Sequence, residues 1–269
     1  RSDPSIDAGT ALAELDRLTS EARRLADADA DELGRLNAAR TLIYSGGQWS
    51  DDRPFTYDHG DPYAIDRKLL PAYLATRLGN CVTMPILFLI LGERLGLDLR
   101  LACAPGHLFV KLHASNGAVL NIETTSGGGF ARTEWFQQCF KISDRAIESG
   151  LFMRSLSRRE AVAEMASTVV EHLMEKGLLD DAASVAAVML EHSTRSCSAM
   201  LHLGAASGLM LRDEFERTYP SPLLIPPAMR ARYHMLMRCN QSAFATAEAL
   251  GWTPDEEYQA DIEAFRRGR

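Results

Sequence analysis

Cys81 and His107 are the residues of this 269-residue chain whose types and settings best support nucleophilic chemistry. Cys81 directly precedes a long apolar segment, and His107 follows Pro105-Gly106 at the start of an alternating segment. A thiolate is a strong nucleophile, and a neighbouring imidazole can accept the proton that the thiol loses. The sequence therefore predicts a thiol active site in which Cys81 attacks and His107 acts as its base.

The segment from Gly79 to Gly96 is expected to position Cys81. It is apolar on nearly every face, which predicts a buried helix. Pro85 has no N–H to donate and fits only the first turn, so the helix should begin near Cys81. The unpaired N–H groups of a helix start would favour a thiolate and could stabilise an oxyanion formed on an attacked carbonyl.

The following segments position His107. Residues 97–103, 107–113 and 118–125 alternate in polarity and are predicted to be strands. Matching the apolar faces of the last two pairs Val110 with Ile122, and this register leaves a three-residue loop, Ser115-Asn116-Gly117. A two-residue Asn-Gly turn would instead pair apolar positions with polar ones.

In the preferred register, Glu123 is a diagonal neighbour of His107 on one face of the hairpin. The two backbones would be roughly 7–8 Å apart, within reach of the side chains. Asn121 lies on the same face and is a second candidate to orient the imidazole. A buried structural carboxylate is the competing interpretation of Glu123.

These motifs together resemble those of the transglutaminase-like superfamily, which has a papain-like fold. The motifs are Gly79-Asn80-Cys81, Pro105-Gly106-His107, and Asn121 to Thr125 followed by two glycines. Within it, the chain resembles the SirB1 branch, in which such a core precedes a tetratricopeptide-like helical region. The resemblance implies an α+β core with a central helix against a small antiparallel sheet, followed by an all-α region.

The resemblance also implies roles for individual residues. Cys81 matches the family's nucleophile and His107 its base, whereas the position that usually holds Asp holds Glu123. Asn121 matches the amide orienter of papain-like enzymes. The candidates for the oxyanion site or substrate loop are Gln48, Trp49 and Asn80. The implied chemistry requires neither a metal nor another cofactor.

The rest of the chain suggests a division into two parts. Residues 1–155 should form the transglutaminase-like domain with an N-terminal helical layer that includes residues 8–42. Residues 156–269 are rich in Ala, Leu and Met and predict paired helices, interrupted by a Pro cluster between 220 and 227. This helical region could bind a protein partner.

Composition limits the function classes. The formal charge of −7 disfavours nucleic-acid binding, and the longest apolar run is too short to cross a bilayer. The five cysteines include no closely spaced pair, so neither a zinc site nor a disulfide framework is expected. We expect a soluble protein, with a weak preference for the cytoplasm. The chain begins at Arg1, which indicates a trimmed N-terminus and leaves its targeting open.

Three functions fit these observations. The first is cysteine-dependent acyl transfer or hydrolysis at an amide of a protein or peptide, by a protease, amidase or transglutaminase. The second is a catalytically silent relative that binds proteins through its helices. The third, arylamine-type acetyl transfer, would need an acyl-CoA site for which the sequence shows no candidate.

Overall fold

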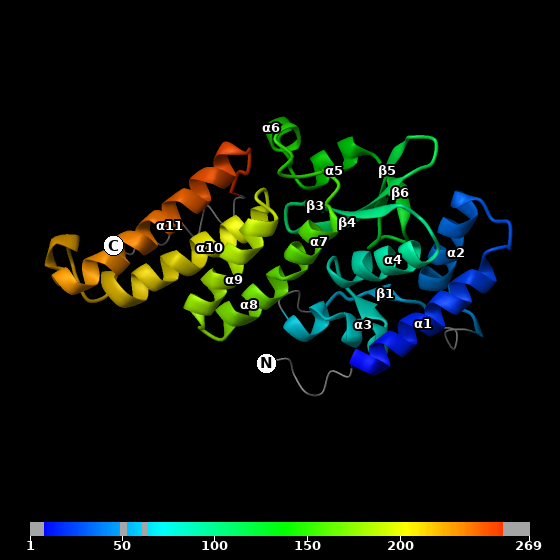
Figure 1. Ribbon diagram of the computed structural model, residues 1–269, viewed down its shortest axis with the longest axis horizontal. Coiled ribbons are helices and arrows are strands. Elements are labelled where there is room, and N and C mark those ends of the chain that lie inside the picture. The colour runs from blue at the N-terminus through cyan, green and yellow to red at the C-terminus, as the bar shows by residue number, and fades with distance from the viewer. Residues whose placement is uncertain (1–7, 49–52, 61–63, 255–269) are drawn as a thin grey trace.

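The computed structural model describes residues 8–48, 53–60 and 64–254 (Figure 1). A four-stranded antiparallel sheet has the order β3-β4-β5-β6, and two short strands, β1 and β2, pair in parallel. The strands are β1 (Thr56–Tyr57), β2 (Leu78–Gly79), β3 (Leu99–Ala104), β4 (His107–His113), β5 (Val119–Glu123) and β6 (Gly129–Ala131).

An N-terminal helical layer covers one face of this sheet. Its helices are α1 (Ala8–Leu25), α2 (Glu32–Tyr44), α3 (Leu70–Thr76) and α4 (Thr83–Arg94), with a 3₁₀ turn at Ile65–Lys68 (η2). The acidic residues between α1 and α2 form a helix junction, where Asp31 caps α2 by accepting a hydrogen bond from the Gly34 N–H. Helix α4 is buried against the sheet because its sequence is apolar on nearly every face.

Both faces of the central sheet are buried, in different clusters. Val110, Leu112 and Ile122 contribute to the main core with α4. On the other face, Phe109 packs against Phe136 of α5 (Thr133–Cys139), with ring centroids 4.2 Å apart. Figure 1 shows α5 and α6 (Asp144–Glu148) on the side of the sheet away from α4.

The predicted hairpin register is confirmed. β4 and β5 pair Val110 with Ile122, and Gly117 has a left-handed φ of +87° in the loop. The Ala114 N–H donates to the Ala118 carbonyl and closes the three-residue loop. The pairing ends at Val110 and Ile122, so Phe109 and His107 lie beyond the ladder. Strand β6 was not predicted, because the glycine run at 127–129 hides a short edge strand.

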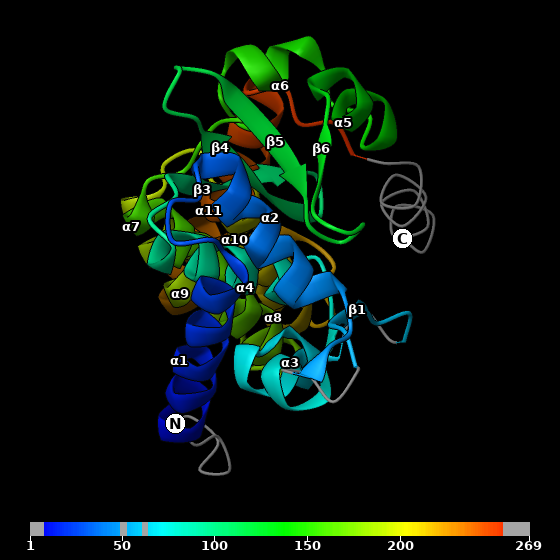
Figure 2. The same cartoon turned by 90° about the vertical axis from the view of Figure 1, so that its right-hand side faces the viewer.

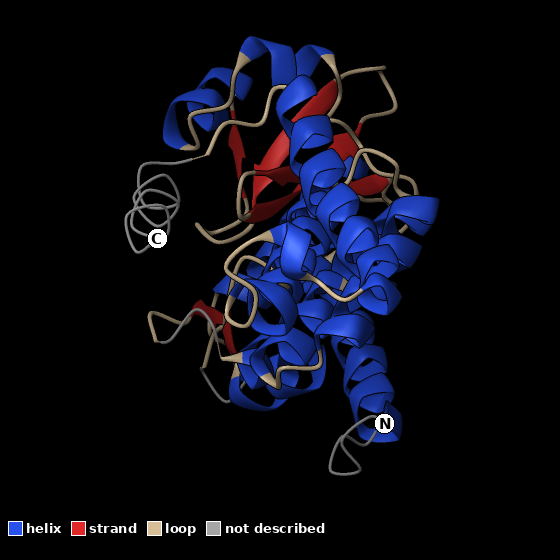
Figure 3. Cartoon of the chain, turned by 90° about the vertical axis from the view of Figure 1, so that its left-hand side faces the viewer, coloured by secondary structure: helices blue, strands red, loops and turns tan. Residues whose placement is uncertain are grey.

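The described residues from 158 onward form helices joined by short connections, and the strands, which are red in Figure 3, all come earlier in the chain. The helices are α7 (Arg158–Met165), α8 (Ser167–Glu175), α9 (Leu179–His192), α10 (Cys197–Leu211) and α11 (Arg230–Ala249). A break at Ala166 separates α7 from α8. After the Pro cluster, the described residues contain α11, and the rest of the predicted helical region, from residue 255 on, lies outside the described residues.

The helical region is joined to the core at two places. Near the expected domain boundary, Met153 and Leu156 donate backbone hydrogen bonds to Cys103 and Leu101 on the edge of β3. About 100 residues later, the end of α11 returns to α6, where Ser143 donates to the Gly251 carbonyl at 2.8 Å. Figure 1 shows this end of α11 near α6. In the described part of the chain, no helix is long and apolar enough to cross a membrane.

Candidate active site

Cys81 lies in the turn between β2 and α4, two residues before the helix begins. The Asn80 carboxamide fills the cap: its Oδ1 accepts hydrogen bonds from Val82 N–H (2.9 Å) and Thr83 N–H (3.1 Å). These first N–H groups are therefore not available to an oxyanion, contrary to the sequence expectation. Within the described residues, the N–H of Cys81 itself meets no acceptor.

The side-chain nitrogen of Asn80 also makes a structural hydrogen bond. Its Nδ2 donates to the Arg67 carbonyl at 3.1 Å, and the residue is 9% exposed. Its backbone N–H donates to Thr83 Oγ1 at 3.1 Å. Asn80 was predicted to contact the oxyanion or the substrate. In the structure its side chain fixes the start of α4, and its amide is not free to bind a substrate.

His107 lies beside Cys81 at the first position of β4. The turn before it contains Gly106 at φ +62°, and the Cys81 thiol donates to the Gly106 carbonyl at 3.7 Å. The Cys81 side chain is also close enough to the imidazole to raise the pKa of His107. Residues 26 positions apart in the sequence are brought together because β3 and β4 return the chain to the start of α4.

Glu123 holds the other side of the imidazole. His107 Nε2 and Glu123 Oε2 are 2.8 Å apart, and the two side chains are only 9% and 7% exposed. Glu123 Oε1 accepts from both Thr125 N–H (2.8 Å) and Thr125 Oγ1 (2.6 Å). The carboxylate is therefore fixed from two directions.

Asn121 lies apart from His107. Its Nδ2 donates to the Ala131 carbonyl at 3.2 Å and to Thr133 Oγ1 at 3.3 Å. The amide therefore joins β5 to β6 and to the start of α5. Of the two predicted orienters, only Glu123 contacts the imidazole.

Opposing effects set the pKa values of this pair. Burial alone would lower the pKa of His107, but hydrogen bonds with Cys81 and Glu123 and the negative charge of Glu123 raise it to about 9. Burial alone would raise the pKa of Glu123, but His107 and Thr125 outweigh it, and the net pKa is lowered. The pair is thus favoured as imidazolium and carboxylate at neutral pH.

Aromatic side chains from α5 cover the imidazole. Phe140 stacks on His107, with ring centroids 4.8 Å apart and planes 21° apart, and Phe136 lies 6.4 Å away. The sequence interpretation did not include these residues. The four-residue spacing of Phe136 and Phe140 indicates that both rings lie on the same face of a helix, but it does not indicate that this face covers His107.

Two aromatic side chains in the segment before α3 lie in different environments, one in the core and one at the surface. Phe55 is buried and packs edge-on against Tyr73 at 5.1 Å. Tyr57, on β1, is 37% exposed, and its pKa is raised by burial and by the nearby Cys81 and Glu123. Gln48 is exposed, and Trp49 lies outside the described residues.

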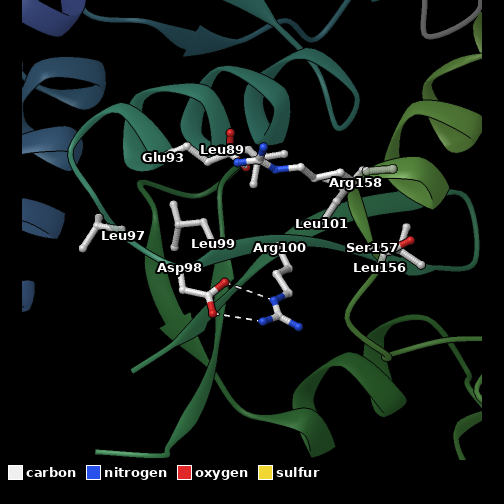
Figure 4. A pocket seen from close by; sticks show the side chains of 11 residues that line it. Leu89, Glu93, Leu97, Asp98, Leu99, Arg100, Leu101, Leu156, Ser157 and Arg158 are labelled. Atoms are coloured by element: carbon white, nitrogen blue, oxygen red, sulfur yellow. Dashed lines mark hydrogen bonds and ion pairs between the residues drawn. The ribbon is translucent and has the colours of Figure 1, made fainter. Parts of the chain in front are cut away.

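Two cavities differ in their relation to this site. One, of about 910 Å³, is lined in part by Glu123 and by α5 residues. The other, of about 380 Å³, lies between α4, β3 and the start of α7 (Figure 4). Its floor is rich in leucine, its rim carries the Asp98–Arg100 and Glu93–Arg158 ion pairs, and its lining includes none of Cys81, His107 and Glu123.

Among the residues that the structure describes, no three His, Cys, Asp or Glu side chains gather in a way that could hold a metal ion.

A family model of the transglutaminase-like superfamily matches residues 9–167, more than half of the chain. This chain belongs to the transglutaminase-like superfamily. The superfamily contains cysteine-dependent enzymes and inactive members. The match ends at the start of α8, so it includes α7 and passes the predicted boundary at residue 155. No curated protein sequence matches the chain.

Proposed function

We propose that this transglutaminase-like protein catalyses cysteine-dependent acyl transfer or hydrolysis at a carboxamide or peptide bond of a protein or peptide. The observation that supports this proposal most directly is the 2.8 Å contact between His107 Nε2 and Glu123 Oε2. It leaves Nδ1 as the ring nitrogen that can accept the proton of Cys81. Nucleophile, base and orienter are thereby in the order that a thiol active site requires.

The reaction would proceed in two halves. The Cys81 sulfur bonds to the carbonyl carbon, the carbonyl π electrons move to oxygen, and the thiol proton resides on His107. When the tetrahedral intermediate collapses, the C–N bond breaks and His107 returns the proton to the leaving amine. Water or an amine then attacks the thioester, gives its proton to His107, and releases the thiol.

The charge state of the site supports a resting imidazolium. With a pKa of about 9, His107 is protonated at neutral pH and is stabilised by the buried Glu123 carboxylate. An imidazolium beside Cys81 can form an ion pair with the thiolate of the proposed mechanism. The negative charge of the thiolate would be compensated within the site.

The backbone N–H of Cys81 is the candidate donor to the oxyanion. Among the described residues, this N–H donates to no acceptor, whereas the N–H groups of Val82 and Thr83 both donate to Asn80 Oδ1. A donor adjacent to the nucleophile lies close to the attacked carbonyl oxygen.

A second candidate function is a silent, protein-binding relative of the SirB1 branch, with tetratricopeptide-like helices. The observation that favours it is a group of exposed valines on successive helices of the C-terminal region. They are Val162 on α7, Val169 on α8 and Val188 on α9, each at least 50% exposed. A contiguous apolar surface is what marks a protein-binding site, and the helices that carry these valines pack on one another.

Alkylation with iodoacetamide, followed by mass spectrometry of each cysteine, tests the proposed enzyme. Cys81 should react at least about ten-fold faster than exposed Cys139 at pH 7, since an ion-paired thiolate is the reactive form. Cys103 and Cys197 should react last, because burial raises the pKa of both thiols, that of Cys197 to about 12.

His107→Ala should slow Cys81 and leave Cys139 unchanged, which makes Cys139 the internal control. A screen of peptide and carboxamide substrates with wild type and Cys81→Ala then identifies turnover. The catalytic function is wrong if Cys81 reacts no faster than Cys139, or if His107→Ala does not change its rate. Either result favours the silent, protein-binding function.

A further inference from the structure

The cavity beside Glu123 connects the candidate active site with two exposed aromatic side chains. Its lining includes Glu123 together with Phe130 of β6 and Trp135 of α5. Phe130 is 51% exposed and Trp135 is 43% exposed. β6 is an edge strand, and the cavity extends around it from the face that carries Glu123 to Phe130.

A run of ring contacts provides a second link between Trp135 and the site. The Trp135 ring meets Phe140 edge-on, with centroids 6.3 Å apart and planes 82° apart. Phe140 in turn stacks on His107 at 4.8 Å. The exposed indole is therefore one ring removed from the imidazole that faces Cys81.

The charges around the cavity do not favour an ionic ligand. Arg132 and Glu134 line it with opposite signs, and both are exposed to solvent. The remaining charge, Glu123, is compensated by His107. Among the residues that line the cavity, an anion would meet the carboxylates of Glu123 and Glu134, and a cation would meet Arg132. Apolar contact is the recognition that these side chains support.

We infer that this cavity binds an aromatic side chain of the peptide substrate, with Trp135 as the main specificity-determining residue and Phe130 as a second contact. This inference rests on the proposed function, since the substrate must reach Cys81. The cavity is lined by Glu123 and not by Cys81, so the bound ring belongs to a residue next to the reacting one or further along the peptide.

The probes are N-acetyl-tripeptidyl chloromethyl ketones. The Cys81 sulfur displaces chloride from the methylene carbon, so an S–C bond forms as the C–Cl bond breaks. The tripeptide Gly-Gly-Gly is compared with peptides that carry one Phe, Asp or Lys at each position in turn. Because burial of an aromatic ring strengthens binding, Phe at one position should raise the alkylation rate about ten-fold over Gly.

The readout is the ratio of the Phe-peptide rate to the Gly-peptide rate in each variant. Trp135→Ala should reduce this ratio to near one, and Phe130→Ala should reduce it partly. Leu223→Ala removes an 85% exposed apolar side chain elsewhere and should leave the ratio unchanged. A preference for Asp or Lys, or a Phe preference that survives both aromatic variants, overturns the inference.

A binding measurement separates this inference from the proposed function. In Cys81→Ala protein, N-acetyl-phenylalanine amide should shift the NMR signal of the Trp135 indole N–H, assigned with Trp135→Phe. N-acetyl-alanine amide should shift it much less. Equal shifts, or equal alkylation rates for all peptides while iodoacetamide still labels Cys81 selectively, overturn the aromatic site alone. A Cys81 that is inert to iodoacetamide overturns the proposed function, and the NMR result then decides the binding site independently.

Discussion

The imidazole of His107 carries most of the chemistry that a single residue contributes to this molecule. It lies between a thiol and a carboxylate, is nearly buried, and is covered by Phe140. Glu123 occupies the position that the resemblance assigns to Asp, and both it and His107 lie beyond the end of the β4–β5 ladder. Its carboxylate reaches His107 Nε2 at 2.8 Å.

The raised pKa of His107 predicts a pH dependence of stability. The folded-state pKa of about 9 exceeds the ordinary value of 6.5, so folding favours the protonated form. The stabilisation is fully present below pH 6.5 and is lost as the pH rises through about 9. The free energy of unfolding should fall by about 3 kcal/mol across this window, as measured by urea unfolding.

Glu123→Gln should remove much of this pH dependence, because a neutral amide no longer stabilises the imidazolium. NMR titration of the His107 ring should give a lower midpoint in the variant than in wild type. Glu134→Gln, at an exposed carboxylate that makes no contact with His107, is the matched control. A wild-type midpoint near 6.5, or equal midpoints in wild type and Glu123→Gln, would contradict the ion-paired site.

At the scale of elements, the start of α4 decides where Cys81 lies. Asn80 satisfies two N–H groups of the first turn and also holds Arg67, so the turn that carries Cys81 has one conformation. β1 and β2 add a second restraint, since the Asp58 N–H donates to the Gly79 carbonyl at 2.7 Å. The nucleophile is thus positioned by a cap and a strand pair just before it, and not by the helix itself.

Asn80→Ala should lower the free energy of unfolding by about 1–2 kcal/mol, because it leaves two helix N–H groups without an acceptor. It should also slow the alkylation of Cys81 relative to Cys139. Asp31→Ala removes the comparable cap of α2 and should cost similar stability without affecting Cys81. Asn80→Ser keeps a neutral cap acceptor and should restore part of the Cys81 rate. Equal effects of Asn80→Ala and Asp31→Ala on that rate would refute the positioning role.

At the scale of the whole molecule, the helical region is held at both of its ends. One end pairs with the edge of β3, and the other packs on α6 through Ser143, Ser149 and Gly251. Figure 2 shows α11 behind the sheet while α1 and α2 lie in front of it. Two attachments that are about 100 residues apart make a single cooperative unfolding transition the expected behaviour.

Gly251→Ala should disrupt the second attachment. Gly251 has φ +104°, and a Cβ there would lie 2.5 Å from the Ala146 backbone nitrogen. Gly177→Ala is the matched control, because Gly177 also has a positive φ, +71°, but open space around it. The control should cost only the backbone strain, about 1–2 kcal/mol, and Gly251→Ala should cost clearly more in thermal unfolding. Equal losses would show that the approach to α6 is not stabilising.

Much of the fold follows from sequence patterns that act over short distances. The apolar run after Cys81 predicted the buried helix, and the alternation around Val110 and Ile122 selected the register that the structure has. The helices between residues 158 and 211 agree with the Ala-, Leu- and Met-rich pattern of this part of the sequence. These features depend on neighbours a few positions apart, which the sequence displays directly.

Other features depended on contacts that no local pattern reports. The sequence by itself determined the pairing of β4 with β5 and the candidate roles of Cys81, His107 and Glu123. Only the tertiary structure separated Glu123 from Asn121, turned Asn80 inward as a cap, placed Phe140 on the imidazole and brought α11 back to α6. The physical reason is that a side chain's hydrogen-bond partner depends on packing between distant segments, whereas periodicity fixes only the face on which the side chain lies.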